Sequence, residues 1–198
     1  MSTYLSVDLD FWNNQFEEVA EDDLEHIFAG AKKLGIPTVA VMNHQQLTPF
    51  VNRSGATKLV NIDTHSDLAD KYVEYRNCGT WVSYVKWRAK GKYKWVHRLS
   101  LFVGECNSGN PIFMDVGPAR MNLVDWSEVS HERVKYLPKA NSLLTDCCSI
   151  GFVLSPSYTN HELQPIFKQM VKKYNIPYLK GTRNEENKLS WATPPKSC

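Results

Sequence analysis

Residues 58–68 read KLVNIDTHSDL, an apolar run that ends in three polar side chains spaced two residues apart. A short apolar run bounded by polar residues is typical of a strand buried in a parallel sheet. Side chains two residues apart lie on one face of a strand, so Asp63, His65 and Asp67 are predicted to converge at its carboxyl end. Asp and Ser also form ordinary turns, so this segment alone leaves both interpretations open.

Two further apolar runs end in the same kinds of side chain. Residues 5–9 predict a short strand that contains Asp8 and is followed by Asp10, and residues 38–44, TVAVMNH, end at His44. Ligand sites in open α/β sheets lie beyond the carboxyl ends of the strands. The three runs therefore predict one cluster of ligands at one edge of a sheet.

Helical periodicity separates some of these runs. Residues 21–34 place apolar side chains on one helical face, and Gly35 follows as a stop. Alternation of such segments with strands predicts an α/β fold with three layers, α/β/α, and a mostly parallel central sheet. The length predicts a single domain over residues 1–198.

The second half of the chain continues the pattern less regularly. Thr159 and Glu162 match a capping box, which predicts that a helix begins there. Gly and Pro interrupt residues 107–139, which are predicted to form loops and short elements. Helix is also predicted for residues 80–90, and strands are predicted for residues 98–105, 149–154 and 176–181.

Composition argues against several classes of protein. The five cysteines are odd in number and lack the paired spacing of a zinc finger, which favours a reducing cytoplasm. We expect no membrane association, because no run reaches the roughly 18 apolar residues of a span and the first residues do not resemble a secretion signal. A formal charge of +2 makes nucleic acid an unlikely general partner.

The predicted cluster carries an excess of negative charge. Two like charges 4 Å apart repel by about 4 kcal/mol at an effective dielectric of about 20, so four neighbouring carboxylates need compensation. Two divalent cations would balance four aspartates. Oxygen ligands with some imidazole suit Mn2+, although zinc, iron and cobalt also accept such ligands.

Three motifs resemble those of the ureohydrolase superfamily, which includes arginase and agmatinase. Residues 63–67, DTHSD, resemble its DxHxD motif, and residues 6–10, SVDLD, resemble its SxDxD motif. Residues 43–44, NH, resemble the end of its upstream histidine motif. The SxDxD element comes first here, whereas in classical members it follows DxHxD. The chain is thus similar to a permuted and shortened member, most like the peptide arginases of ribosomal peptide maturation.

This resemblance implies an arginase-like fold, two Mn2+ ions and a defined reaction. Peptidyl-arginine in a ribosomally made precursor peptide would be hydrolysed to peptidyl-ornithine and urea, with water held between the metals as nucleophile. Asp10 and His65 would be the catalytic side chains. The implied ligands are Asp8 and Asp63 as bridges, His44 and Asp67 in one coordination shell, and His65 and Asp10 in the other.

Substrate recognition departs from the family pattern. Classical arginases place a glutamate before an NP-like turn, but residues 151–156, GFVLSP, contain no acid. Glu105 is the replacement that we predict, because a carboxylate can accept paired hydrogen bonds from a guanidinium group. The proton-shuttling histidine of classical members is also missing, and His161 and His97 are the candidates for its role.

Two other functions stay open at this point. The same metals could serve a hydrolase of a small guanidino or amide substrate. Residues 84–98, YVKWRAKGKYKWVHR, interleave basic and aromatic side chains, which suits a module that binds nucleic acid or a peptide. The competing interpretation of this stretch is a helix that packs Trp81 and Val85 inward and turns its basic residues to water.

Overall fold

The structure is a computed structural model that describes residues 2–13, 15–68, 79–85, 91–98 and 128–180. These residues form a seven-stranded sheet in which every strand pair is parallel, in the order β5-β4-β3-β1-β6-β2-β7. The strands are β1 Thr3–Asp8, β2 Thr38–Val41, β3 Lys58–Ile62, β4 Lys92–Arg98, β5 Glu128–Val134, β6 Cys147–Val153 and β7 Tyr178–Leu179.

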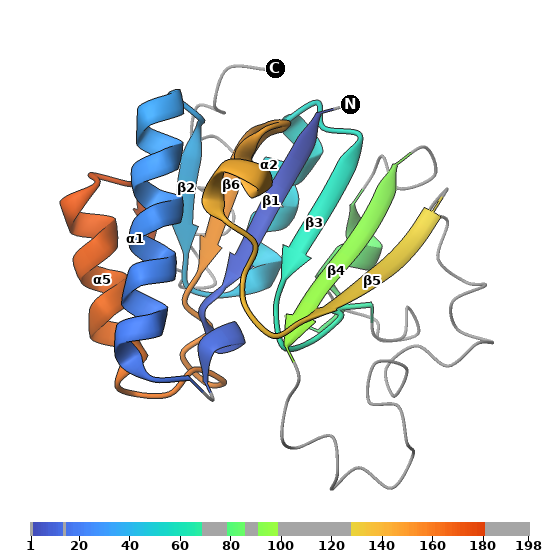
Figure 1. Cartoon of the computed structure of the whole chain (residues 1–198). Coiled ribbons are helices and arrows are strands. Elements are labelled where there is room, and N and C mark those ends of the chain that lie inside the picture. Colours follow the sequence, from blue (N-terminus) through green and yellow to red (C-terminus); the bar gives the residue numbers. More distant parts are fainter. Residues whose placement is uncertain (1, 14, 69–78, 86–90, 99–127, 181–198) are drawn as a thin grey trace, which may run out of the picture.

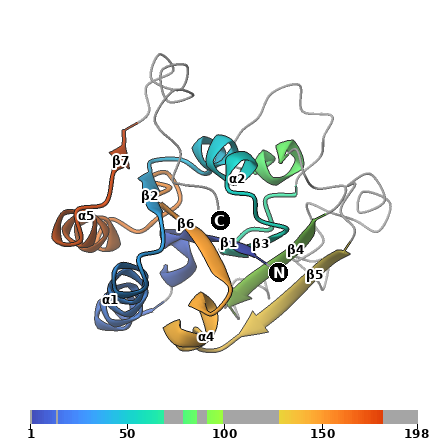
Figure 2. The ribbon, with the colours of Figure 1, turned by 90° about the horizontal axis from the view of Figure 1, so that it is seen from above.

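Helices cover both faces of the sheet, as the view from above shows (Figure 2). One face carries α1 Glu17–Leu34, α4 Ala140–Leu144 and α5 Leu163–Lys173. The other face carries α2 Thr48–Arg53 and two short 3-10 helices, η2 His44–Leu47 and η3 Trp81–Tyr84. The three-layer α/β/α architecture with a parallel sheet is confirmed. Among the described helices, none combines the length and the apolar composition that a membrane span requires.

The face under α1 is closed by apolar packing. Leu24, Ile27 and Phe28 of α1 are buried against the sheet, and the ring of Phe28 stacks on Phe152 of β6 with centroids 3.8 Å apart. The helix begins one turn earlier than predicted and ends at the predicted Gly35, which adopts φ 65°.

A glycine sets the close approach of η2 to the sheet on the opposite face. A Cβ atom at Gly151, in the middle of β6, would lie 2.5 Å from Cδ2 of Leu47 and 2.8 Å from the hydroxyl of Tyr4. Such distances are shorter than non-bonded contacts allow, so a larger residue would push η2 away. Because η2 begins at His44, this packing positions one of the candidate ligands.

Several boundaries differ from the predictions. Within the predicted helix 80–90, Trp81–Tyr84 form a 3-10 turn and Val85 is extended, and residues 86–90 lie outside the described residues. The fourth strand lies at Lys92–Arg98, before the predicted 98–105, whose residues from 99 onward lie outside the described residues. The strand β5 was not predicted within 107–139.

The capping box was also predicted wrongly. Glu162 is the residue that precedes α5, and it makes no capping hydrogen bond through its side chain. The hydroxyl of Thr159 instead donates to the carbonyl of Leu154, 2.7 Å away. The hydroxyl that the motif assigned to the helix end thus forms a hydrogen bond with the backbone of Leu154 instead. The predicted strands at residues 5–9, 38–44, 58–65, 149–154 and 176–181 are all present, with shifted ends.

Candidate metal centre

The predicted ligands lie at the edge of the sheet where β1, β2 and β3 end, at the bottom of Figure 1. Asp8 is the last residue of β1, Asp63 directly follows β3, and His44 begins η2 just after β2. Strand β6 lies between β1 and β2 in the sheet, so these two ligand-bearing strands are not neighbours.

Turns, and not continued strands, bring the remaining ligands to the same place. Asp8 Oδ1 accepts a hydrogen bond from the backbone N–H of Asp10, 3.0 Å away, and this caps the 3-10 helix η1, Leu9–Trp12. Asp63 Oδ1 accepts in the same way from the N–H of His65 at 2.7 Å. Asp67 has a left-handed backbone with φ 54°. The predicted convergence is correct, but strand alternation is not its cause.

Four of the side chains form a buried group that we call the inner group, made of Asp8, His44, Asp63 and Asp67. Nδ1 of His44 lies 3.0 Å from Asp8 Oδ2, 3.2 Å from Asp63 Oδ2 and 2.9 Å from Asp67 Oδ2. One imidazole nitrogen carries at most one hydrogen, so it cannot satisfy three carboxylates at once. The four atoms instead present a set of inward-facing electron pairs.

The second set, the outer group, consists of Asp10, Asp63 and His65. Nδ1 of His65 lies 3.1 Å from Asp10 Oδ2 and 3.6 Å from Asp63 Oδ1. Its side chain is 47% exposed, whereas the two carboxylates are buried. The ring of Tyr158 meets the His65 ring edge-on, with centroids 5.7 Å apart. Asp63 therefore belongs to both groups, with one oxygen directed at each histidine.

The pKa values of the acids reflect the crowding of charge. Burial, together with the charges of Asp8 and Asp63, raises the pKa of Asp10 well above its usual range. Burial and the charge of Asp63 raise the pKa of Asp67 to about 7. These carboxyls would hold protons at pH values where exposed aspartates are ionised, so positive charge is favoured at this point of the molecule.

The pKa values of the two histidines are raised as well. Hydrogen bonds to Asp10 and Asp63 raise the pKa of His65 to about 12. Burial opposes the protonation of His44, but the surrounding carboxylates, first Asp67 and then Asp8, outweigh burial and raise the pKa of His44 well above its usual range. Both imidazoles thus attract a proton in the place that a metal cation would take.

The residues present fit two divalent cations. The ligand atoms of Asp8, His44 and Asp63 all lie within 4.8 Å of one another, and so do those of Asp10, Asp63 and His65. Oxygen and imidazole donors in this ratio suit Mn2+, and zinc, iron and cobalt accept them too. Two cations would also replace the protons that the acids otherwise need.

Four uncharged side chains around the inner group were not predicted as functional. Asn61 lies two residues before Asp63 on the same strand, which is a signal that sequence reasoning could have used. Ser6 stands inside the SxDxD-like motif, but no role was assigned to it. Trp81 and Ser155 come from distant parts of the chain and carry no local signal. Each of the four hydrogen-bonds to a member of the inner group.

Of the residues predicted to bind the substrate or to move protons, the structure describes His161 and His97, and it brings neither to the cluster. Glu105 lies outside the described residues. His161 is exposed, and within the described part of the chain no interaction joins it to the ligands. His97 is buried in β4, where its ring stacks on Trp95 with centroids 4.2 Å apart, and burial lowers its pKa to about 4.

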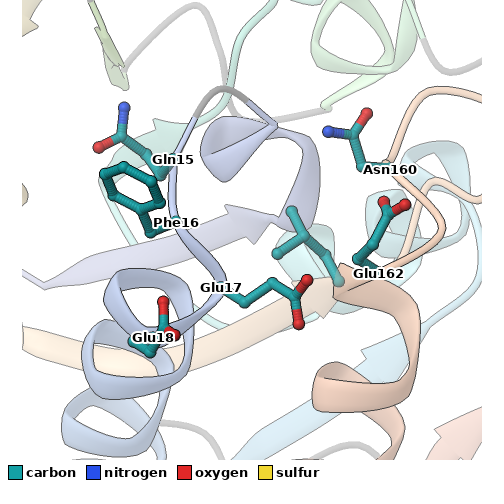
Figure 3. A pocket seen from close by; sticks show the side chains of 7 residues that line it. Gln15, Phe16, Glu17, Glu18, Asn160 and Glu162 are labelled. Carbon is teal, nitrogen blue, oxygen red and sulfur yellow. The ribbon is translucent and has the colours of Figure 1, made fainter.

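A pocket of about 520 Å³ opens at the start of α1 and α5, as the close view shows (Figure 3). Its wall includes Asn160, whose backbone and side chain hydrogen-bond to Asn13. Tyr158, which meets His65, lies two residues before Asn160 in the chain. The pocket is lined by Gln15, Phe16, Glu17, Glu18, Asn160, Glu162 and Leu163.

Comparison of the chain with protein-family models, curated proteins and solved structures finds no match. The ureohydrolase resemblance therefore stays a prediction based on three motifs. The geometry of the cluster is an independent observation, because it depends on the coordinates of six side chains and not on any relative.

The basic and aromatic stretch 84–98 is a strand over its described second half. Tyr93 and Trp95 are buried in the core, and the amino group of Lys92 lies 2.6 Å from Glu128 of β5. Lys94 pairs in the same way with Glu132. These lysines are therefore partly neutralised by the neighbouring strand, and the predicted helix is wrong for this part.

Proposed function

We propose that the chain is a dimetal hydrolase of the arginase type, which converts arginine side chains of a precursor peptide to ornithine and releases urea. The observation that carries the proposal is the meeting of all six predicted ligands in two groups that share Asp63. A chance set of strand-end residues would have no reason to aim carboxylate oxygens at both histidines.

The chemistry divides between the metals and the side chains. When bound, two divalent cations supply the positive charge that activates a water molecule for attack on a guanidinium carbon. Asp10 Oδ2 orients the ring of His65 from 3.1 Å, which fixes the imidazole at the open side of the site. Because Asp10 Oδ2 lies 3.1 Å from Nδ1 of His65, these two side chains are placed to move a proton to the departing amine.

The charge of one pocket supports a cationic substrate. Glu17, Glu18 and Glu162 line the pocket at the start of α1 and α5 and give it negative charge. An arginine side chain is always positively charged, so such a surface favours its approach. The exposed fraction of His65 and the breadth of the pocket favour a peptide over a substrate that must be fully enclosed.

The direct test compares substrates on Mn2+-loaded protein. Arginine-containing peptides, free arginine and agmatine would each be incubated, with urea measured by colorimetry and the peptide by mass spectrometry. We expect urea from the peptides together with a mass decrease equal to one CH2N2 group per arginine, and no urea after chelation. Urea from agmatine or arginine alone would favour a small guanidino substrate, and urea from none of them would refute the assignment.

A further inference from the structure

Each side chain of the inner group also contacts an uncharged side chain that is not one of the predicted ligands. Ser155 Oγ donates to Asp8 Oδ2 at 2.5 Å, and Trp81 Nε1 donates to Asp67 Oδ2 at 2.5 Å. Around the same centre, Asn61 Nδ2 donates to Asp63 Oδ2 at 3.2 Å, and Ser6 Oγ meets His44 Nε2 at 2.9 Å.

Two of these contacts involve unusual backbone conformations. Asp67 has φ 54° and Ser155 has φ 43°, and the one other non-glycine residue with positive φ among the described residues is Asn175. Left-handed conformations are unfavourable for residues with a Cβ atom, although asparagine tolerates them. Such strain persists where the surrounding structure determines it, so its presence on both sides of one site indicates a functional constraint.

Trp81 has a further contact with the same group. Its indole is fully buried and stacks on the ring of His44, with centroids 5.0 Å apart and an interplanar angle of 19°. One side chain therefore touches two ligands of the inner group, through its N–H and through its ring face. Ser155 contacts the group from a distant part of the sequence, 147 residues after Asp8.

We propose that Trp81 and Ser155 are positioning residues that hold Asp67 and Asp8 ready for a divalent cation at the inner group. The inference rests on the metal-binding part of the proposed function. Outer partners of metal ligands fix ligand orientation, and their removal costs about 10- to 100-fold in metal affinity. The same loss is expected here for the inner cation, while the fold survives.

Two substitutions test the proposal with matched controls. Trp81→Phe keeps an aromatic ring over His44 but removes the N–H donor. Its control is Trp12→Phe, because Trp12 is equally buried and its Nε1 donates to the carboxylate of Asp23 at 2.9 Å, outside the site.

The second pair is Ser155→Gly and Asn175→Gly. Both replacements suit a positive φ, but only the first removes a hydroxyl that contacts a ligand. The affinity and number of bound Mn2+ ions would be measured for the full chain by titration with Mn2+ alone, with free Mn2+ followed by electron paramagnetic resonance. Melting temperatures of the metal-free proteins would be recorded beside these titrations.

Wild-type protein and both controls are expected to bind two Mn2+ ions with equal affinities. Trp81→Phe and Ser155→Gly are expected to bind one of the two ions about tenfold or more weakly. If both site variants bind Mn2+ with wild-type affinity, the proposal is overturned and Trp81 and Ser155 have only a structural role. If Trp81→Phe does not fold, Ser155→Gly decides. Absence of Mn2+ binding by the wild type would instead overturn the proposed function itself.

Discussion

The inner and outer groups share Asp63, but they differ in their burial and in the side chains that surround them. The inner group is buried, and uncharged donors stand behind its ligands. The outer group opens to solvent at His65, which has an exposed tyrosine beside it. Under the proposed function, the inner group would retain a metal and the outer group would meet the substrate.

The strongest perturbation should be the loss of the shared ligand. Asp63→Ala removes one carboxylate oxygen from each group, so we expect both Mn2+ ions to be lost and urea release to fall to the level of chelated protein. Metal content after gel filtration would be measured by mass spectrometry. Asp22→Ala, which removes an exposed aspartate on α1, is the matched control and should retain both ions. Retention of both ions by Asp63→Ala would contradict the shared role.

Replacing His44 should destabilise the metal-free protein more than replacing His65. His44→Ala leaves three buried carboxylates without their cation, and we expect a loss of about 3–5 kcal/mol in the free energy of unfolding. His65→Ala acts at a half-exposed site and should cost less than about 1 kcal/mol. Urea denaturation in the presence of a chelator would measure both. Equal losses would remove the distinction between the groups.

The pH dependence of metal binding should follow the protons that the metals displace. The folded metal-free chain binds a proton at Asp67 up to about pH 7, whereas an unfolded aspartate releases it near its usual pKa of about 4. This group therefore contributes stability at low pH that is lost as pH rises toward 7, and metal binding requires the same proton to leave. We expect Mn2+ affinity to rise by up to about tenfold per pH unit for each displaced proton below pH 7.

Calorimetry in buffers of different ionisation enthalpy would count the released protons. We expect the gain in melting temperature on adding Mn2+ to be larger at pH 8 than at pH 6. A gain that is independent of pH, with no proton release, would contradict the protonated state of the metal-free cluster.

A substitution at Gly151, which contacts no ligand, should weaken Mn2+ binding at the inner group and not at the outer group. Gly151→Ala would place a methyl group against Leu47, and the displacement of η2 should cost about 1–3 kcal/mol and weaken one Mn2+ site. Gly30→Ala on α1 is the control for a crowded methyl group elsewhere, because its Cβ would lie 2.7 Å from Cδ1 of Leu144, which contacts no ligand. Thermal unfolding and Mn2+ titration would compare the two. Equal effects would show that η2 does not depend on this contact.

The smallest effect is expected at the pocket at the start of α1 and α5. Replacing Glu17 and Glu162 with glutamine removes two charges that line it, and the KM for an arginine peptide should rise about two- to fivefold at low salt, with kcat unchanged. Glu21→Gln, one turn further along α1, serves as the control for the loss of an exposed charge. A change in kcat without a change in KM would indicate that the pocket does not bind the peptide.

The ligand positions could be predicted because their signal is local. Each apolar run is followed by its own polar residues, and parallel strands bring their carboxyl ends to one edge. The strand β5 could not be found in this way, because EVSHERV is polar and half exposed at the edge of the sheet. Pairing with β4, including the contact between Lys92 and Glu128, determines that strand.

The roles of Trp81 and Ser155 could not be predicted from sequence patterns, because they also depend on contacts between distant segments. Trp81 meets a ligand 14 residues away, and Ser155 meets one 147 residues away. The sequence predicted a helix over residues 80–90, but the indole of Trp81 donates to Asp67 and residues 81–84 form a 3-10 turn. Contacts between distant segments determine the positions of Trp81 and Ser155, and local secondary-structure propensity cannot predict such contacts.

The place of β6 in the sheet has a consequence for biosynthesis. All six candidate ligands lie within residues 8–67, yet β6 separates β1 from β2 and comes from residues 147–153. Until that strand is made, nothing sets the spacing of about 10 Å between the two strands that it joins. A ribosome-bound chain carrying every ligand would therefore still lack the assembled site, and metal loading would have to await synthesis of β6.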